Sequence, residues 1–222
     1  MKYRSVFDII GPIMVGPSSS HTAGAVRIGL LTRYIFGYQP EKIKITLYGS
    51  FKETYKGHGT DIALIGGLLG YNTSDKRIRT SLENAKEAGI DFEFIESEVE
   101  HIHPNTAKLE VETGRHSLDL VGKSIGGGKM IIFELLGFDV NLSGDFPSYF
   151  IFYKFNESNK VQLLSEVEAI FGNNKVSTNF SDSILEGTNL LVVETLEEIS
   201  DEQLEKITKL GYVNEVKFAD RL

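Results

Sequence analysis

The stretch GPSSSHTAGAVRIGLLTRYIFG at residues 16–37 decides the fold of the first half of the chain. From Ala23 to Phe36 its apolar side chains recur every three or four residues, and Gly37 follows them. This spacing predicts a helix over 23–36 that ends at Gly37, because glycine readily adopts the left-handed conformation that terminates helices. Three serines, a histidine and a threonine lie directly before it, where the first N–H groups of a helix have no partner within the helix.

The residues on either side of this helix predict a mixed α/β unit. Residues 42–47 alternate between polar and apolar side chains, as in a strand with one buried face. The pattern predicts helices over 61–69 and 81–88, a hairpin formed by 108–112 and 117–125, and a strand or a helix over 130–136. Ser5 is expected to cap a short helix that carries Phe7, Ile9 and Ile10.

The last third of the chain predicts six elements in the order β-α-β-β-α-β, which is the ferredoxin-like arrangement. They are expected at 148–155, 160–171, 175–182, 189–195, from 200 to the stop at Gly211, and 213–218. The first helix is expected to bury Val161, Leu164, Val167 and Phe171, and Ser200 with Gln203 forms a capping box for the second. This order at this size resembles an ACT domain, a module that commonly binds amino acids or mediates dimers.

The turn-rich stretch at 142–147 predicts a boundary between two domains, residues 1–145 and 146–222, in an α+β protein. Charge also differs between them: residues 1–145 carry 18 acidic and 16 basic residues, whereas residues 146–222 carry 13 and 7. The net charge of −8 argues against nucleic acid or an anionic membrane as the main partner. No apolar run is long enough to span a membrane and no signal peptide is evident, so a cytoplasmic protein is expected.

The chain of 222 residues has no cysteine, which excludes a disulfide framework, a thiol nucleophile and an iron–sulfur cluster held by its own thiolates. Two histidines, His101 and His103, lie two apart, but no third ligand completes a metal site at a recognisable spacing. Residues 126–129 (GGGK) lack the spacing of a phosphate-binding loop and favour a backbone turn.

Two polar segments precede predicted helices. In the first, Ser18, Ser19, Ser20, His21 and Thr22 suit an anion such as a carboxylate, and His21 could also move a proton near neutral pH. A serine-rich helix cap with an exposed histidine is the alternative.

In the second segment, glycines flank His58, and Thr60 or Asp61 can cap the next helix. A close approach of backbone to ligand and a flexible surface loop explain this pattern equally well. Because neither segment contains an obvious nucleophile or metal set, we expect a site that another chain completes.

Four segments resemble the beta subunit of the bacterial iron–sulfur-dependent L-serine dehydratases (L-serine ammonia-lyases). They are SVFDIIGPIMVGPSSSHTAGAVRIG at 5–29, LYGSFKETYKGHGTDIALIGG at 47–67, HPNT at 103–106 and SIGGGK at 124–129. With the ACT-like tail, the resemblance covers essentially the whole chain. It implies that the first domain resembles the allosteric substrate-binding (ASB) domain of some phosphoglycerate dehydrogenases.

The resemblance also implies a partner and a reaction. An alpha subunit is expected to carry a [4Fe–4S] cluster with one iron open to substrate, and L-serine is converted to pyruvate and ammonia without pyridoxal phosphate. The open iron acts as a Lewis acid on the serine hydroxyl. Potassium is a further cofactor that the family allows, but nothing in the sequence locates a site for it.

On this resemblance, Ser18, Ser19, Ser20 and Thr22 bind the carboxylate or ammonium group of serine, and His21 transfers a proton or orients the substrate. His58, Thr60 and Asp61 form the opposite wall, with Asn105 as a weaker candidate. The other reading is a regulatory or assembly subunit that binds an amino acid without catalysing turnover. The turn at 156–160 lacks the usual proline or glycine of ACT domains, which favours homodimerisation over effector binding by the tail.

Overall fold

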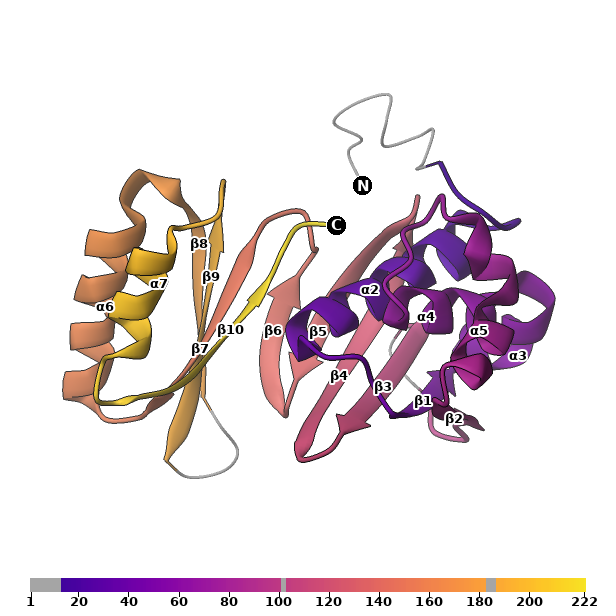
Figure 1. Ribbon diagram of the computed structural model, residues 1–222, viewed down its shortest axis with the longest axis horizontal. Coiled ribbons are helices and arrows are strands. Elements are labelled where there is room, and N and C mark those ends of the chain that lie inside the picture. Colours follow the sequence, from indigo (N-terminus) through magenta and orange to yellow (C-terminus); the bar gives the residue numbers. More distant parts are fainter. Residues whose placement is uncertain (1–12, 101–102, 183–186) are drawn as a thin grey trace. The chain divides into compact units, whose positions relative to one another are not determined.

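The computed structural model describes residues 13–100, 103–182 and 187–222 (Figure 1). Within these residues it contains six α-helices and ten strands, so the chain is a mixed α/β protein. Their contacts divide these residues into two compact units. The first runs to Leu136 and also includes Asn141–Ser143 and Leu222, and the second comprises Gly137–Val140 and Gly144–Arg221. The domain boundary expected at 145/146 stays a prediction. The helix expected from Ser5 also stays a prediction, because it lies outside the described residues. None of the described helices has the length and hydrophobicity needed to cross a bilayer.

The first sheet has the strand order β2-β1-β3-β4-β5-β6, and helices lie over one of its faces (Figure 1). The β1–β2 pair is parallel, whereas β1–β3, β3–β4 and β4–β5 are antiparallel. The elements are a π-helical turn η1 (Ser19–Ala23), α2 (Gly24–Phe36), β1 (Lys42–Tyr48), α3 (Gly49–His58), α4 (Thr60–Leu68), a 3-10 turn η2 (Lys76–Thr80), α5 (Ser81–Glu87), β2 (Asp91–Glu96), β3 (Thr106–Thr113), β4 (His116–Gly126), β5 (Lys129–Leu135) and β6 (Phe138–Leu142).

Burial alternates along β1 as the sequence predicts. Ile43, Ile45 and Leu47 are buried, whereas the intervening side chains are partly or fully exposed. On the more open face Lys44 forms a cross-strand ion pair with Glu110 of β3 at 3.4 Å. One face of the sheet therefore supports the helices and the other carries charge.

Helix α2 is confirmed, and Gly37 ends it in the left-handed conformation with φ 79°. It packs closely on α4 at two glycines. A Cβ atom added at Gly29 would lie 2.3 Å from the carbonyl oxygen of Leu64, and one at Gly67 would lie 2.2 Å from that of Val26. Only glycine permits this approach of two helix backbones.

The helices over 61–69 and 81–88 and the hairpin around 114–115 are confirmed, and residues 130–136 belong mainly to a strand, β5. The sequence reading missed α3. Residues 55–58 form its last turn, and Gly57 lies inside the helix rather than in a loop. Only Gly59 has the left-handed conformation, with φ 68°, and it separates α3 from α4.

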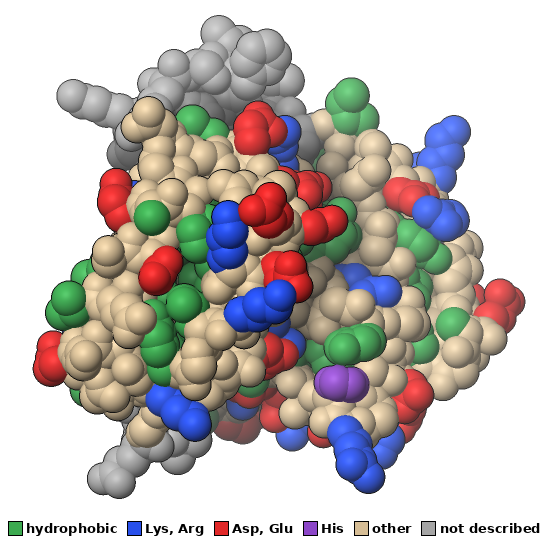
Figure 2. All heavy atoms as spheres, turned by 60° about the vertical axis from the view of Figure 1, so that its left-hand side comes forward, with side chains coloured by type: hydrophobic (Ala, Val, Ile, Leu, Met, Phe, Trp, Pro, Cys, Tyr) green, Lys and Arg blue, Asp and Glu red, His purple; other side chains and the backbone are tan. Residues whose placement is uncertain are grey.

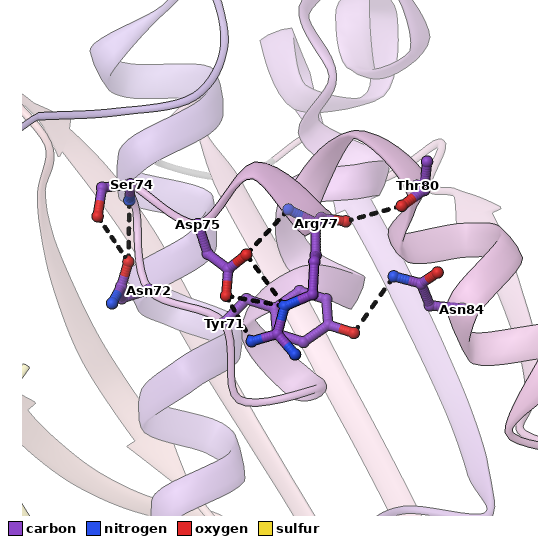
Figure 3. Close-up of polar contacts among 7 residues, drawn as sticks. All are labelled: Tyr71, Asn72, Ser74, Asp75, Arg77, Thr80 and Asn84. Atoms are coloured by element: carbon purple, nitrogen blue, oxygen red, sulfur yellow. Dashed lines mark hydrogen bonds and ion pairs between the residues drawn. The ribbon is translucent and has the colours of Figure 1, made fainter.

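A polar turn lies between α4 and α5 (Figure 3). The guanidinium of Arg77 lies 4.2 Å from the ring centroid of Tyr71 and pairs with Asp75 at 2.6 Å, which lowers the pKa of that carboxyl. Within the same turn Thr73 donates its hydroxyl to the carbonyl of Ile13 and accepts the N–H of Val15. The residues just before the serine-rich segment are thereby tied to the turn between α4 and α5.

The second sheet has the order β10-β7-β9-β8 and is antiparallel throughout, with two helices on one face (Figure 1). Its elements follow the chain order strand, helix, strand, strand, helix, strand: β7 (Ser148–Lys154), α6 (Glu157–Phe171) with a 3-10 turn η3 (Gly172–Asn174), β8 (Lys175–Ser181), β9 (Thr188–Thr195), α7 (Asp201–Thr208) and β10 (Val213–Ala219).

Two details of these helices differ from the expectation. Leu163, Val167 and Phe171 are the buried residues of α6, whereas Val161 is 66% and Leu164 is 42% exposed. Leu163 is in phase with Val167 and Phe171 at intervals of four, so the buried face is rotated from the one predicted. The capping box of Ser200 with Gln203 is confirmed, but α7 ends at Thr208, before Gly211.

We expect Gly67→Ala to lower the free energy of unfolding by about 1–3 kcal/mol, because α2 and α4 must move apart to admit a methyl group. Urea denaturation measures this change. Gly57→Ala is the matched control, since an added Cβ there meets no atom within 4 Å and a helical alanine is favoured over glycine by up to about 1 kcal/mol. Unchanged stability of Gly67→Ala would contradict the close contact of the two helices.

Candidate functional site

Four segments that are far apart in sequence meet at the start of α2. The ring of His21 contacts Ser50 at the start of α3, and the N–H of Phe51 donates to the carbonyl of Pro104. The N–H of Ser124 in turn donates to the carbonyl of Asn105 at 2.9 Å. A Cβ added at Gly24 would lie only 2.1 Å from the Ser124 hydroxyl oxygen, so the hairpin at 124–129 rests directly on α2.

Ser18 caps the helix, as the alternative reading of the serine-rich segment predicts. Its hydroxyl oxygen accepts the N–H of His21 at 3.1 Å, and its carbonyl accepts N–H groups from both Thr22 and Ala23. The last of these bonds makes the first turn π-helical, a distortion that is frequent at functional sites. Ser19 and Ser20 follow in this turn, half-buried, and neither side chain hydrogen-bonds to another described residue.

Hydroxyl groups face both nitrogens of the His21 ring. Nε2 lies 3.0 Å from the Ser50 hydroxyl oxygen, and Nδ1 lies 3.4 Å from that of Ser18. The rings of Phe51 and His58 meet it edge-on, with centroids 5.4 and 4.8 Å away. Burial lowers the pKa of His21, and the nearby His58 lowers it further, so the ring is predominantly neutral at neutral pH.

His58 and Thr22 connect the end of α3 to the turn that contains His21. The Thr22 hydroxyl donates to the carbonyl of His58 at 3.0 Å, and the His58 side chain is exposed. The His58 ring makes no hydrogen bond within the described part of the chain. It is therefore the more accessible of the two histidines.

Thr60 and Asp61 begin α4 immediately beyond Gly59. Thr60 is fully buried, and its hydroxyl has no hydrogen-bond partner among the described residues. The Asp61 carboxylate accepts the N–H of Ile62 at 2.8 Å. Burial nevertheless raises the pKa of Asp61, outweighing the opposite effects of that N–H and of Lys56.

The backbone of Asn105 has a structural role that the sequence did not indicate. Both of its hydrogen bonds shown by the structure use the backbone: its N–H donates to His103 Nδ1, and its carbonyl accepts from Ser124. Nothing in these contacts assigns its side chain to a ligand.

The glycine-rich turn and the histidine pair were the remaining candidates from the sequence. Gly126, Gly127 and Gly128 form a tight turn in which all three have positive φ. Among the described residues, no group of three or more His, Cys, Asp or Glu could hold a metal ion, and His101 lies outside them.

Comparison with known proteins identifies the family. A family model described as "Serine dehydratase beta chain" matches residues 5–88. The "Probable L-serine dehydratase, beta chain" of Bacillus subtilis (strain 168) is 46% identical over 99% of this chain and 100% of its own length. The chain belongs to the L-serine dehydratase beta chains.

Two further relatives match smaller shares of this chain and of their own length. The "L-serine dehydratase, beta chain" of Peptoniphilus asaccharolyticus is 41% identical over 67% of this chain and 68% of its own. The "L-serine dehydratase 2" of Escherichia coli (strain K12) is 33% identical over 52% of this chain but only 23% of its own length. In the longer relative, the beta-like region is thus a small part of one polypeptide.

Ser50 is the residue of this beta chain that sequence reasoning missed. It lies within the segment quoted for the family resemblance, but 29 residues from His21, and α3 was not predicted. With α3 known, Ser50, Thr54 and His58 recur at intervals of four and share one helix face. That periodicity is the signal that would have pointed to Ser50.

We expect His58→Ala to raise the pKa of His21, because it removes part of the burial and the electrostatic effect of His58, both of which lower that pKa. Histidine NMR signals followed against pH measure this, with His116→Ala as control, since His116 stacks on Tyr38 instead. An unchanged or lower pKa in His58→Ala would contradict the coupling.

The lowered pKa has a consequence for stability. The folded chain holds the His21 proton less tightly than the unfolded chain does. The contribution of neutral His21 is therefore present above about pH 6.5 and is lost as the pH falls below it.

Proposed function

We propose that this beta chain contributes substrate-binding residues to an active site shared with an alpha subunit, which converts L-serine to pyruvate and ammonia. The observation that carries the proposal is the meeting of His21, His58 and the serine-rich start of α2 in one place. The beta-chain names of its relatives support an alpha-chain partner and a serine substrate. The E. coli relative, with a beta-like region inside a longer chain, supports a site built from more than this region.

The proposed [4Fe–4S] cluster belongs to the alpha subunit. This chain has no cysteine and its described residues form no group of three metal ligands, so its own side chains do not fit a cluster. Hydroxyls, imidazoles and backbone N–H groups suit the organic part of the substrate instead. When bound in the partner, the cluster would supply Lewis-acid chemistry at the serine hydroxyl.

The start of α2 is the proposed carboxylate site. Ser19 and Ser20 offer hydroxyls and N–H groups at the positive end of a helix, and Ser18 and Thr22 support that turn through their own hydrogen bonds. The starts of α2 and α4 lie at the same end of a parallel helix pair, because Thr22 meets His58 while Gly29 meets Gly67. Both helix dipoles therefore favour an anion at this end.

The remaining residues form the proposed opposite wall. The accessible ring of His58 and the hydrogen-bonded ring of His21 are the candidates for proton transfer and substrate orientation. Asp61, with its raised pKa, and the buried Thr60 hydroxyl are the candidates for polar contacts with the substrate. Asn105 would act mainly through its backbone, which joins His103 to Ser124 of β4.

We expect serine turnover only when this chain is mixed anaerobically with its alpha subunit. His21→Ala in the mixture should lower turnover by about 10²–10⁴-fold, the usual contribution of a proton-transferring residue, while the two chains still associate on size-exclusion chromatography. His116→Ala is the control that should retain activity.

Two results would contradict this proposal. Normal turnover by His21→Ala would indicate a regulatory or assembly subunit that binds an amino acid without taking part in the chemistry. Turnover by this chain alone would exclude an active site that depends on the alpha subunit.

For the two units we propose an ASB-like domain followed by an ACT-like domain. Support for the second comes from its chain order of strands and helices and its sheet order β10-β7-β9-β8. The carboxamides of Asn156 and Asn159 bond locally, to the Asn159 N–H and the Lys154 carbonyl. This favours dimerisation over amino-acid binding by the tail.

The exposed apolar residues of α6, Val161 and Leu164, are the proposed dimer contact. Figure 2 shows one face of the molecule, where hydrophobic side chains lie among acidic and basic ones. We expect Leu164→Lys to shift the chain from dimer to monomer in sedimentation velocity. Leu196→Lys, at a residue that is 52% exposed in the turn after β9, is the matched control and should remain dimeric. A dimer unaffected by Leu164→Lys would contradict this contact.

A further inference from the structure

We propose that Ser50 is a positioning residue that fixes the ring orientation and the protonated nitrogen of His21. This inference deepens the proposed function and rests on it for any effect on turnover. Its own content, the state of the His21 ring, can be measured without the alpha subunit.

The first argument is that the ring is held at both nitrogens. Ser50 lies 3.0 Å from Nε2 and Ser18 lies 3.4 Å from Nδ1, so turning the ring over would disturb both contacts. Phe51 and His58 flank the same ring. The contact with Ser50 is the shorter of the two, and Ser50 belongs to α3, whereas Ser18 and His21 belong to the start of α2.

The second argument is that Ser50 is itself held in place. Gly49 has φ 51°, and a Cβ there would lie 2.8 Å from both Cα and the carbonyl oxygen of Pro104. The N–H of Phe51 donates to the Pro104 carbonyl at 3.2 Å, and the Thr54 hydroxyl donates to the Ser50 carbonyl at 2.7 Å. The loop at 103–105 thus supports the helix start that presents Ser50 to His21.

The third argument concerns the proton of the neutral ring. The Ser18 oxygen accepts the His21 backbone N–H, and its second lone pair and its proton let it act as acceptor or donor toward Nδ1. The 3.0 Å between Nε2 and the Ser50 oxygen is the usual length of an N–H···O hydrogen bond, so we place the ring proton on Nε2, which leaves Nδ1 to accept from the Ser18 hydroxyl. In this assignment the hydrogen bond to Ser50, the shorter of the two, holds the ring in its Nε2–H tautomer.

The test is a long-range ¹H–¹⁵N correlation experiment on the full chain labelled at its histidines. Above the pKa of His21 we expect the parent chain to show the Nε2–H pattern, and Ser50→Ala to show a mixture of tautomers. Ser50→Thr keeps the hydroxyl and should restore the parent pattern. Ser74→Ala removes a serine hydroxyl that bonds Asn72 in the turn after α4, and should leave the pattern unchanged.

The outcomes separate this inference from the proposed function. A parent tautomer pattern in Ser50→Ala, or the same change in Ser74→Ala, would overturn the positioning role. If Ser50→Ala alone changes the pattern, the positioning role is supported. Turnover in the reconstituted pair then tests the proposed function: we expect a loss of about ten- to hundredfold in Ser50→Ala, rescued in Ser50→Thr. A changed tautomer with normal turnover would uphold the positioning role and count against a part for His21 in the reaction.

Discussion

The close packing of α2 on α4 is the constraint on which the candidate site depends. Gly29 and Gly67 let the two backbones approach so closely that a methyl group at either position would collide with a carbonyl oxygen. Because the helices run parallel, this contact also fixes where both begin. Ser18 to Thr22 and Thr60 with Asp61 are therefore brought to one end of the pair, although about forty residues separate them.

This arrangement places two positive helix ends side by side, which is unfavourable unless solvent or an anion compensates for them. The Ser18 hydroxyl accepts the His21 N–H at the start of α2, and the Asp61 carboxylate accepts the Ile62 N–H at the start of α4. The N–H groups of Ser19 and Ser20 precede the first helical hydrogen bonds. In the proposed function, a small carboxylate would be held by these dipoles and hydroxyls.

The sequence was most informative where structure is local. Periodicity and caps located α2, β1 and the capping box at Ser200, because these depend on neighbours within a few residues. It failed where tertiary contacts override local preference. Gly57 suggests a turn, yet α3 continues through it. On α6 two apolar faces compete, and only packing against the sheet selects Leu163 over Leu164. For the site, the serine–histidine segment was visible, whereas its contact with Ser50 depends on a helix that was not predicted.

The two histidines differ in a way that follows from this geometry. The centroids of their rings lie 4.8 Å apart, but His21 is half-buried between two hydroxyls and two rings, whereas the His58 side chain is exposed. A ring held at both nitrogens gains orientation and loses freedom to exchange protons with solvent. A ring at the surface has the opposite properties. A site completed by a second chain needs one wall that is rigid before the partner arrives and one group that can still adjust to it. Within this chain, His21 with Ser50 fits the first requirement and His58 the second.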